Sequence, residues 1–246
     1  MKNSICLICL MPRKVWLDFL SKFENYTVFI VIDDNYYDYV EKYKCEYPNL
    51  TFIQIKDGRH ISANFRDLDR PYTPLTVWHK ALYYFSVENL ETENVWFIED
   101  DVFFYNENTI RMIDYNYVDY DYLSNVVTES SADSWRWTNT TVKYELPWYS
   151  ANVSATRLSR TLLQKINEYA QNNGTLFAID AMLPTIARKN DLRCEFPKEM
   201  IHICERDTID LNAIRYDMMY SPMKYIDSFP SMRRFITDVF FRTPRK

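Results

Sequence analysis

Apolar runs and helical segments alternate through the first part of the chain. Residues 4–10, 27–32 and 50–55 are apolar, rich in β-branched side chains and nearly uninterrupted, which is typical of strands buried on both faces of a mainly parallel sheet. Between them, residues 13–25 carry apolar side chains at spacings of three and four, which predicts an amphipathic crossover helix. Residues 35–45 are a second helical candidate. The pattern therefore predicts a β-α-β-α-β opening.

A loop leads from the third predicted strand into the next helix. It contains Gly58, Pro71 and Pro74, and the following residues 75–88 place four large apolar side chains on one helical stripe. The next predicted strand, 95–98, is the most apolar of the chain and runs directly into three consecutive acids.

The second half is less regular. Residues 128–147 are polar and form a predicted long loop or lid. The predicted strands are 122–127, 148–153 and 200–204, and the predicted helices are 156–170 and 181–189. Asn172-Asn173-Gly174 is predicted to end the first of these helices, because Asn and Gly tolerate the left-handed cap position. Together, the elements predict an α/β fold, an α/β/α sandwich around a mainly parallel central sheet.

Composition fits one folded domain with elaborations. The chain has 246 residues, of which 47% are hydrophobic and 26% charged. Its formal net charge of −5 gives no positive field for nucleic acid, so we expect no nucleic-acid partner. Gly58 and Gly174 are the only glycines, which excludes both the G-x-G-x-x-G turn of Rossmann dehydrogenases and the P-loop of NTPases.

The N-terminus and the cysteines favour a cytoplasmic location. The apolar run 5–11 is far shorter than the roughly 20 residues of a membrane span, and no small-residue cleavage site follows it. We therefore expect no signal peptide and no transmembrane segment. Five cysteines without a framework spacing are expected to be free thiols. Cys6 and Cys9 form a C-x-x-C pair, but their odd separation in a strand places them on opposite faces, which favours buried structural thiols over a zinc site.

The sharpest chemical signal is the acidic triplet Glu99-Asp100-Asp101. Three acids at the end of a buried strand repel one another unless a cation or hydrogen-bond donors compensate. The carboxyl end of a central strand is also where ligands bind in open α/β sheets. Because side chains alternate along a strand, Glu99 and Asp101 can face one cleft while Asp100 points elsewhere. Such oxygen ligands suit Mg²⁺ or Mn²⁺ carrying a diphosphate.

Two stretches resemble the GT-A fold of nucleotide-sugar-dependent glycosyltransferases. Residues 95–102, Val-Trp-Phe-Ile-Glu-Asp-Asp-Val, resemble the "DxD" strand in its Glu-Asp-Asp form, with Glu at a first position that is most often Asp. Residues 28–35, Val-Phe-Ile-Val-Ile-Asp-Asp-Asn, resemble the second-strand motif whose terminal acids contact the nucleoside. The resemblance covers residues 4 to about 205, and it implies a GT-A-like fold and a UDP-sugar as donor.

The resemblance also implies roles for individual acids. Asp101 would be the direct ligand of Mn²⁺ or Mg²⁺, with Glu99 as a further candidate ligand, and Glu99 or Asp100 would hold the ribose or the sugar. Asp33 and Asp34 would accept hydrogen bonds from the base or ribose. The simpler alternative is that these acids cap helices beginning near residues 106 and 35, since Asp is a favoured N-cap residue.

Two residues further along are candidates for the acceptor side and the metal. Asp180, in the stretch 177–185, resembles the family's acid before an acceptor-side helix and would be the general base of an inverting transfer; alternatively it caps that helix. The family often draws a further metal ligand from a late His, which would be His202 here. A lone His beside Met200 and Cys204 can equally be an ordinary core residue.

Basic and aromatic residues supply the remaining candidates. Lys80 and Arg66 are candidate nucleotide-sugar contacts near where the family carries a basic residue, although Lys80 lies opposite the apolar stripe of its helix, so solvent exposure is its default. Trp135, Trp137 and Trp148 lie where an acceptor would bind, and their flat faces can pack on sugar rings or simply in a core.

The expected organisation is one GT-A-like catalytic domain over residues 1–210, with a nucleotide half to about 105 and an acceptor half from 106. Residues 211–246 form a predicted helical extension, whose basic and apolar pattern suits either peripheral membrane contact or packing on the domain. The leading hypothesis is a metal-dependent glycosyltransferase acting on a glycan, lipid or protein hydroxyl. A metal-dependent nucleotidyl- or phosphotransferase and a non-catalytic sugar- or nucleotide-binding relative are the alternatives.

Overall fold

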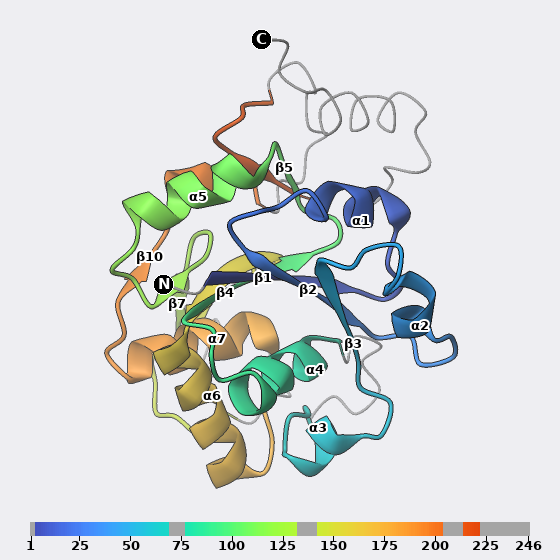
Figure 1. The fold of residues 1–246 in the computed structure, drawn as a ribbon. Coiled ribbons are helices and arrows are strands. Elements are labelled where there is room, and N and C mark those ends of the chain that lie inside the picture. Colours follow the sequence, from blue (N-terminus) through green and yellow to red (C-terminus); the bar gives the residue numbers. More distant parts are fainter. Residues whose placement is uncertain (1–2, 69–76, 132–141, 204–213, 222–246) are drawn as a thin grey trace.

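A seven-stranded sheet with strand order β10-β6-β9-β4-β1-β2-β3 forms the centre of the molecule (Figure 1). The structure is a computed structural model that describes residues 3–68, 77–131, 142–203 and 214–221. Within the sheet, β9 runs antiparallel to both of its neighbours and the other pairs are parallel. The strands are β1 (Asn3–Cys9), β2 (Thr27–Ile32), β3 (Leu50–Gln54), β4 (Asn94–Glu99), β6 (Tyr122–Leu123), β9 (Ala155–Ser159) and β10 (Cys194–Glu195). This is the predicted α/β fold with a mainly parallel sheet.

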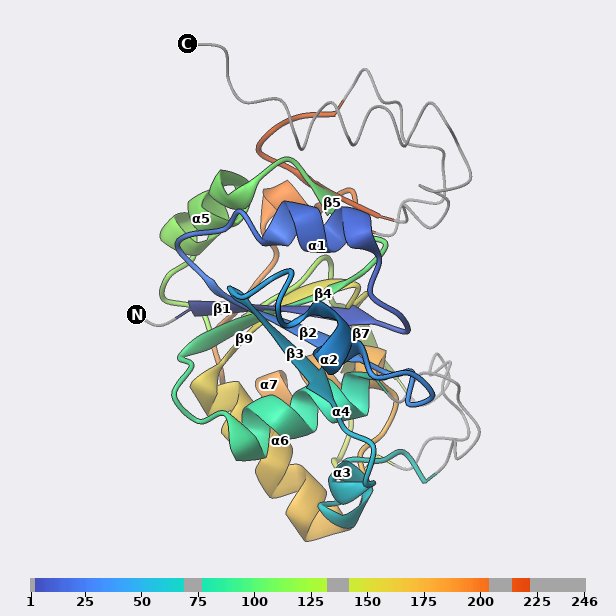
Figure 2. The same cartoon turned by 45° about the vertical axis from the view of Figure 1, so that its right-hand side comes forward.

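Helices cover both faces of the sheet, as Figures 1 and 2 show. One face carries α1 (Lys14–Leu20), α2 (Tyr39–Tyr43) and α5 (Glu107–Asn116), whose buried side chains join one core cluster. The opposite face carries α4 (Val77–Tyr83), α6 (Arg160–Asn173) and α7 (Ile179–Lys189), which build a second cluster. Shorter helical elements are α3 (Arg59–Ser62), the π-helical turn η1 (Tyr84–Glu88) and the 3-10 turn η2 (Lys198–Met200).

Strand β1 is almost continuously apolar because both of its faces are buried. Leu7 and Cys9 point into the first cluster, whereas Cys6 and Ile8 point into the second. Cys6 and Cys9 are thus buried free thiols on opposite faces, as predicted. Burial is the main cause that raises the pKa of both thiols, so they stay protonated and unreactive at neutral pH.

In the first half, the predicted helices differ from the structure in length, and the short helix α3 lies in the predicted loop. The helix predicted at 13–25 ends at Leu20, because the Ser21 hydroxyl donates to the Asp18 carbonyl and the Glu107 carboxylate holds the following amides, Glu24 N and Asn25 N. The helix predicted at 35–45 is the shorter α2, which begins after its N-cap Asp38. The helix predicted at 75–88 continues past Tyr83 as the π-helical turn.

The largest error concerns the predicted helix 156–170. Its first part is β9, whose residues pair with β4 on one side and β6 on the other. The helix α6 begins only after Ser159, whose hydroxyl accepts from the amide of Leu162. Gly174 ends this helix at φ 71° in the left-handed region, as predicted.

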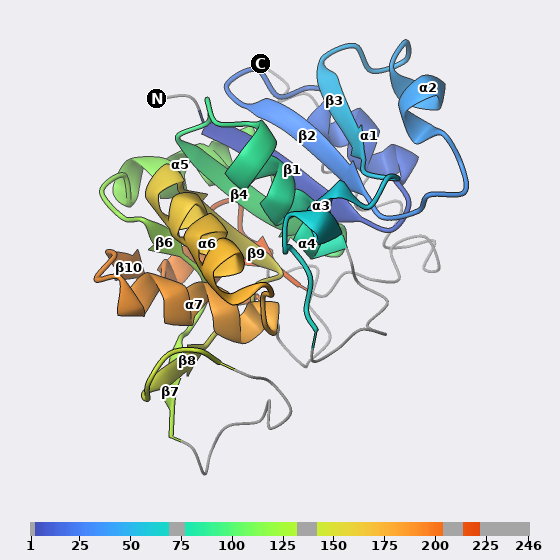
Figure 3. The same ribbon diagram turned by 90° about the horizontal axis from the view of Figure 1, so that it is seen from below.

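Three further predictions for the second half were wrong in detail. Part of the predicted loop 128–147 is β7 (Thr128–Ser130), which pairs with β8 (Trp148–Ser150) in a separate ribbon that Figure 3 shows beyond α7. The predicted strand 122–127 shortens to the two residues of β6. The predicted strand 200–204 is replaced by the 3-10 turn and one bridge from His202 to Tyr220. Short segments bounded by turns lack the periodicity that separates strand from loop.

A buried ion pair ties the sheet to α5. The Asp114 carboxylate accepts from Tyr26 Oη at 2.6 Å, Trp96 Nε1 at 3.0 Å and Arg157 Nη1 at 2.9 Å. Arg157, which is 1% exposed, also donates to the carbonyls of Tyr117 and Tyr120. This network joins β4, β9 and the residue before β2 to α5, and within the described residues only the Arg157 Nε lacks a hydrogen-bond partner in it.

Acidification is expected to destabilise the fold through His79, a buried residue of α4. Burial, followed by the charge of His60, lowers its pKa from 6.5 to about 4. The unfolded chain therefore binds the proton first as the pH falls, so the stability contributed by neutral His79 is present above pH 6.5 and is lost toward pH 4. Between pH 7 and pH 5 this single group is expected to lower the free energy of unfolding by about 2 kcal/mol.

Urea denaturation of wild type and His79→Gln at those two pH values measures this effect. The wild type should lose about 2 kcal/mol more than the variant on acidification. If both proteins lose the same free energy of unfolding between pH 7 and pH 5, the pKa of His79 is not lowered in the folded protein.

Several predictions fall on other parts of the chain. Trp135, Trp137, Cys204 and most of the predicted helical extension 211–246 lie outside the described residues. The described part of that extension, residues 214–221, holds the strand β11 (Met219–Tyr220). Among the described helices, none combines the length and the apolar character that crossing a bilayer requires.

Candidate functional site

The strand order of the central sheet reverses between β1 and β4. From β1 the chain crosses to β2 and β3 on one side, whereas β4 lies on the other, so β1 and β4 flank the point where the order reverses. Ligands of open α/β sheets bind at such a point. Residues 10–13 follow β1 there, Asp33 follows β2, and the acidic triplet follows β4.

The three acids of the triplet have different surroundings. Glu99 accepts from the Trp78 indole Nε1 at 2.9 Å on the α4 side of the sheet. Asp100 lies on the α1 side, where its Oδ2 is 3.3 Å from Arg13 Nε and its carbonyl accepts from Trp16 Nε1 at 2.8 Å. Glu99 and Asp100 therefore face opposite sides, as strand alternation predicted.

Neither capping alternative describes these acids. The helix after the triplet is capped by Asn106, whose side chain accepts from the amide of Asn108. The helix after Asp33-Asp34 is capped by Asp38. The alternative that these acids are N-caps was therefore wrong, both for the triplet before α5 and for Asp33-Asp34 before α2.

The charges of two other carboxyl groups, Asp101 and Asp180, act on Glu99. Burial raises the pKa of Glu99 above its usual range, and the negative charges of Asp101 and Asp180 raise it further. Asp101 is 5% exposed. Glu99 and Asp101 thus lie at the carboxyl end of β4, and the charge of Asp180 acts on Glu99 from α7.

Asp180 lies in the first turn of α7. The N-cap of this helix is Ala178, which offers no side-chain oxygen, so the prediction that Asp180 caps the helix was wrong. The carbonyl of Asp180 accepts from the Ala151 amide at 2.8 Å, which joins the start of α7 to the segment after β8. A carboxylate in the first turn is stabilised by the positive end of the helix dipole.

Lys80 differs from its expected exposure. It is 2% exposed, and its Nζ lies 2.8 Å from Asp33 Oδ1 and donates to the Asp33 carbonyl at 2.9 Å. It also approaches Asn35 Oδ1 at 3.4 Å. The prediction that Lys80 faces solvent by default was wrong, because every residue of α4 is buried and the helix has no solvent face at this position. Lys80 thereby fixes the backbone and side chain of the predicted nucleoside motif.

A cavity of about 660 Å³ opens beside this motif. It is lined by Leu10 and Met11 after β1 and by residues 33–36 after β2. Asp34 accepts from the Tyr36 amide and the Tyr39 hydroxyl, and these two hydrogen bonds lower the pKa of its carboxyl, so it is ionised at neutral pH. The size suits a small organic ligand, and the fully exposed Tyr36 offers it an aromatic face.

The remaining predicted residues lie nearby or serve the core. His202 stacks on Tyr220 at 4.9 Å between ring centroids and bridges it in a small sheet. In that sheet β11 (Met219–Tyr220) pairs with β5 (Phe103–Phe104), which follows Asp101 after one residue. Trp148 donates to the Tyr144 carbonyl and packs against the second core cluster. The Arg66 carbonyl accepts from Leu176 N, beside the entry to α7.

The donor set fits a cation only in part. No group of three or more His, Cys, Asp or Glu side chains within reach of one ion occurs in the described ranges. Mg²⁺ is commonly held by one or two carboxylates together with substrate phosphates. Asp101 and Glu99 fit that arrangement, with phosphate oxygens completing the coordination.

Sequence patterns missed the groups that support the acids. Trp78 on α4 contacts Glu99, and Arg13, just before α1, contacts Asp100. The Ser154 carbonyl accepts from the Glu99 amide at 2.8 Å. Trp78 was assigned to the apolar stripe of its helix, because a pattern of apolar positions does not report which side-chain N–H groups donate hydrogen bonds. These contacts join residues more than twenty positions apart, so local periodicity does not report them.

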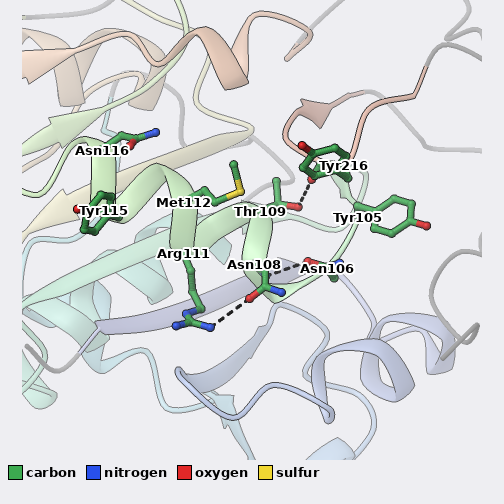
Figure 4. A pocket seen from close by; sticks show the side chains of 9 residues that line it. All are labelled: Tyr105, Asn106, Asn108, Thr109, Arg111, Met112, Tyr115, Asn116 and Tyr216. Atoms are coloured by element: carbon green, nitrogen blue, oxygen red, sulfur yellow. Dashed lines mark hydrogen bonds between the residues drawn. The ribbon is translucent and has the colours of Figure 1, made fainter. Parts of the chain in front are cut away.

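Another cavity lies along the outer face of α5 (Figure 4). It measures about 790 Å³. Its walls hold Tyr105, Met112, Tyr115 and Tyr216, and Thr109 donates to the Tyr216 carbonyl at 2.6 Å. None of the predicted site residues lines this cavity.

Comparison with known proteins supports the fold. No protein-family model and no curated protein sequence matches the chain. A structure of the galactosyltransferase LgtC with donor and acceptor sugar analogues is similar, with a TM-score of 0.50 and 9% identity over 99% of this chain and 98% of that chain. A 4-diphosphocytidyl-2C-methyl-D-erythritol synthase from Anaerococcus prevotii has a TM-score of 0.48 and 11% identity over 80% of this chain and 86% of that chain. The architecture is GT-A-like and Rossmann-type, as predicted.

Proposed function

We propose that this protein is a glycosyltransferase that moves a sugar from a nucleoside diphosphate sugar to a hydroxyl acceptor. The observation that carries the proposal is the position of Glu99 and Asp101 at the carboxyl end of β4, beside the point where strand order reverses, with the charge of Asp180 acting on Glu99 from α7. The GT-A-like fold supports the same function, because LgtC, which shares it, is a galactosyltransferase whose structure holds donor and acceptor sugar analogues. Uridine is the proposed base of the donor.

The cavity beside Asp33 and Asp34 is the proposed nucleoside site. Asp34 is ionised and can accept from the ribose hydroxyls or the base. Lys80 has its ammonium on Asp33, so its proposed role changes from direct diphosphate contact to holding the Asp33–Asn35 backbone in place. Arg66 stays a candidate for direct contact with the donor.

The reaction needs a leaving group that is neutralised and an acceptor that loses a proton. Asp101 and Glu99 would hold Mn²⁺ or Mg²⁺, whose charge offsets that of the departing diphosphate. In an inverting transfer, the Asp180 carboxylate takes the acceptor O–H proton while that oxygen bonds to the anomeric carbon. The bond from the anomeric carbon to the diphosphate breaks, and its electron pair leaves with the nucleoside diphosphate.

His202 and the three tryptophans complete the proposal. His202 is a candidate further ligand of the cation, because the small sheet that contains it begins two residues after Asp101. Trp135, Trp137 and Trp148 remain candidates for contact with the acceptor. Trp148 has its indole N–H bonded to Tyr144, so only its ring face is available for such contact.

Thermal stability in the presence of nucleotides tests the nucleotide part of the proposal. Wild type and Asp101→Ala would be melted with UDP, GDP and CMP, each with and without Mn²⁺. A nucleotide at about 100 times its dissociation constant stabilises by about 2.7 kcal/mol, which raises the melting temperature by about 5–10 °C in a chain of this size. We expect that shift for UDP with Mn²⁺ in the wild type and no shift in the variant. The absence of any shift with every nucleotide would overturn the proposal.

A further inference from the structure

A smaller polar cavity lies at the foot of the β7–β8 ribbon. It has a volume of about 280 Å³. The residues that line it are Asn125, Val126, Thr128, Ser130, Ser150, Ala151 and Asn152. All of its polar side chains are amides or hydroxyls, and none of the described residues in its wall is charged. The cavity therefore offers hydrogen bonds without an electric charge.

Hydrogen bonds connect this cavity to the acids. Asn125 Oδ1 accepts from the Asn152 amide at 3.2 Å, and Asn152 Oδ1 accepts from the Ser154 amide at 3.0 Å. The Ser154 carbonyl in turn accepts from the Glu99 amide. Asn125 follows β6, which lies two strands from β4, about 10 Å across the sheet. The cavity is thus linked to Glu99 by a chain of three hydrogen bonds.

The second wall of the cavity is attached to α7. The Ala151 amide donates to the Asp180 carbonyl, and the Thr185 hydroxyl exchanges hydrogen bonds with both backbone groups of Tyr149. The ribbon is therefore held against the helix that carries the proposed general base. The Asn125 amide also donates to the Ile203 carbonyl at 2.8 Å, next to His202.

Several polar groups in the cavity are available to a ligand. The ribbon register pairs Thr128 with Ser150 and places Ser130 on the same face. Within the described parts of the chain, the hydroxyls of these three residues and the amide nitrogen of Asn152 make no hydrogen bond. A ligand with several hydroxyl groups can satisfy them together.

We propose that this cavity binds one neutral sugar ring, an inference that rests on the proposed glycosyl transfer and names its sugar class. The volume lies at the lower limit of small-ligand pockets, which suits a single ring and is too small for a nucleotide. Amides and hydroxyls pair with sugar hydroxyls as both donors and acceptors. A ring bearing a carboxylate or phosphate would lose its hydration here without a cation to compensate. The ring belongs either to the donor or to the acceptor.

Saturation-transfer NMR with methyl glucoside, methyl galactoside, methyl mannoside and methyl glucuronide tests the sugar class without a nucleotide. We expect at least one neutral glycoside to bind the wild type and the glucuronide not to bind. The variants Thr128→Val and Ser150→Ala each remove one hydroxyl without touching the backbone links to Glu99, and each should weaken that binding about two- to tenfold. Ser62→Ala, an exposed hydroxyl on α3, is the matched control and should bind as the wild type does.

Calorimetry with UDP and UDP-glucose distinguishes the two sources of the ring. If the ring is the donor's, Thr128→Val and Ser150→Ala weaken UDP-glucose binding and leave UDP binding unchanged. If the ring is the acceptor's, the two variants weaken binding of the methyl glycoside and leave the binding of UDP and UDP-glucose unchanged. Binding of the glucuronide, no binding of any neutral glycoside, or variants that bind every sugar as the wild type does would overturn the inference. If the sugar-ring inference fails but the wild type still binds UDP, the proposed function stands. If the wild type binds no nucleotide, the proposed function is overturned.

Discussion

Replacement of Asp101 by asparagine is expected to lower Mn²⁺-dependent cleavage of the donor by about two to three orders of magnitude. Asparagine keeps the size of the side chain in a position that is 5% exposed, but it removes the charge that would hold the cation against the diphosphate. The leaving group would then depart with its negative charge uncompensated. Release of nucleoside diphosphate from the sugar nucleotide that stabilises the wild type is the measurement.

A control variant and a folding measurement accompany Asp101→Asn. Asp119→Asn removes an exposed carboxylate outside the site and should leave the rate unchanged. Circular dichroism melting of Asp101→Asn should show a folded protein. A folded variant that retains a rate within about tenfold of the wild type, with the same Mn²⁺ dependence, would remove Asp101 from the proposed metal site.

Replacement of Asp114 by alanine is expected to lower the free energy of unfolding by about 3–5 kcal/mol. The change deletes the acceptor of Tyr26, Trp96 and Arg157 and leaves the Arg157 guanidinium buried without its carboxylate. A loss of this size is a large part of the total stability of a typical domain, which is about 5–15 kcal/mol. Urea denaturation monitored by tryptophan fluorescence measures it.

The double variant Asp114→Ala with Arg157→Met tests the cause of that loss. If the uncompensated charge dominates, the double variant should regain part of the stability that the single variant loses. Asp119→Ala serves as the exposed control and should change stability by less than about 0.5 kcal/mol. A loss below about 1 kcal/mol for Asp114→Ala would show that the buried pair is not a structural link between the sheet and α5.

The sequence predicts this fold well where burial leaves a strong pattern. Strands β1, β2 and β4 are buried on both faces and therefore apolar along most of their length, so their positions and the acids that follow them could be placed from residue types alone. Strand β9 could not, because its Thr156 and Arg157 are buried polar residues whose partners lie in β6 and α5. Its five residues look like the start of the helix that follows. The Ser159 cap was the local signal that marks the boundary.

Sequence patterns predicted on which side of the strand Glu99 and Asp100 lie, but they did not predict the residues that contact these acids. Strand alternation correctly placed Glu99 and Asp100 on opposite faces. Lys80 could not be placed correctly, because a helical wheel reveals one apolar stripe and α4 is covered on all sides. Its pairing with Asp33 spans 47 positions and depends on how α4 packs on the sheet. Long-range ion pairs of this kind require the tertiary structure.

The most direct test of the central claim is the fate of a labelled oxygen. The wild type would be incubated with UDP-glucose and Mn²⁺ in water enriched in heavy oxygen, in which water replaces the acceptor, and the products would be analysed by mass spectrometry. Glycosyl transfer breaks the bond between the anomeric carbon and oxygen, so the account predicts that the label enters the sugar and that the UDP is unlabelled. A label in the phosphate, with UMP and a sugar phosphate as products, would show attack at phosphorus and would contradict the assignment of this protein as a glycosyltransferase.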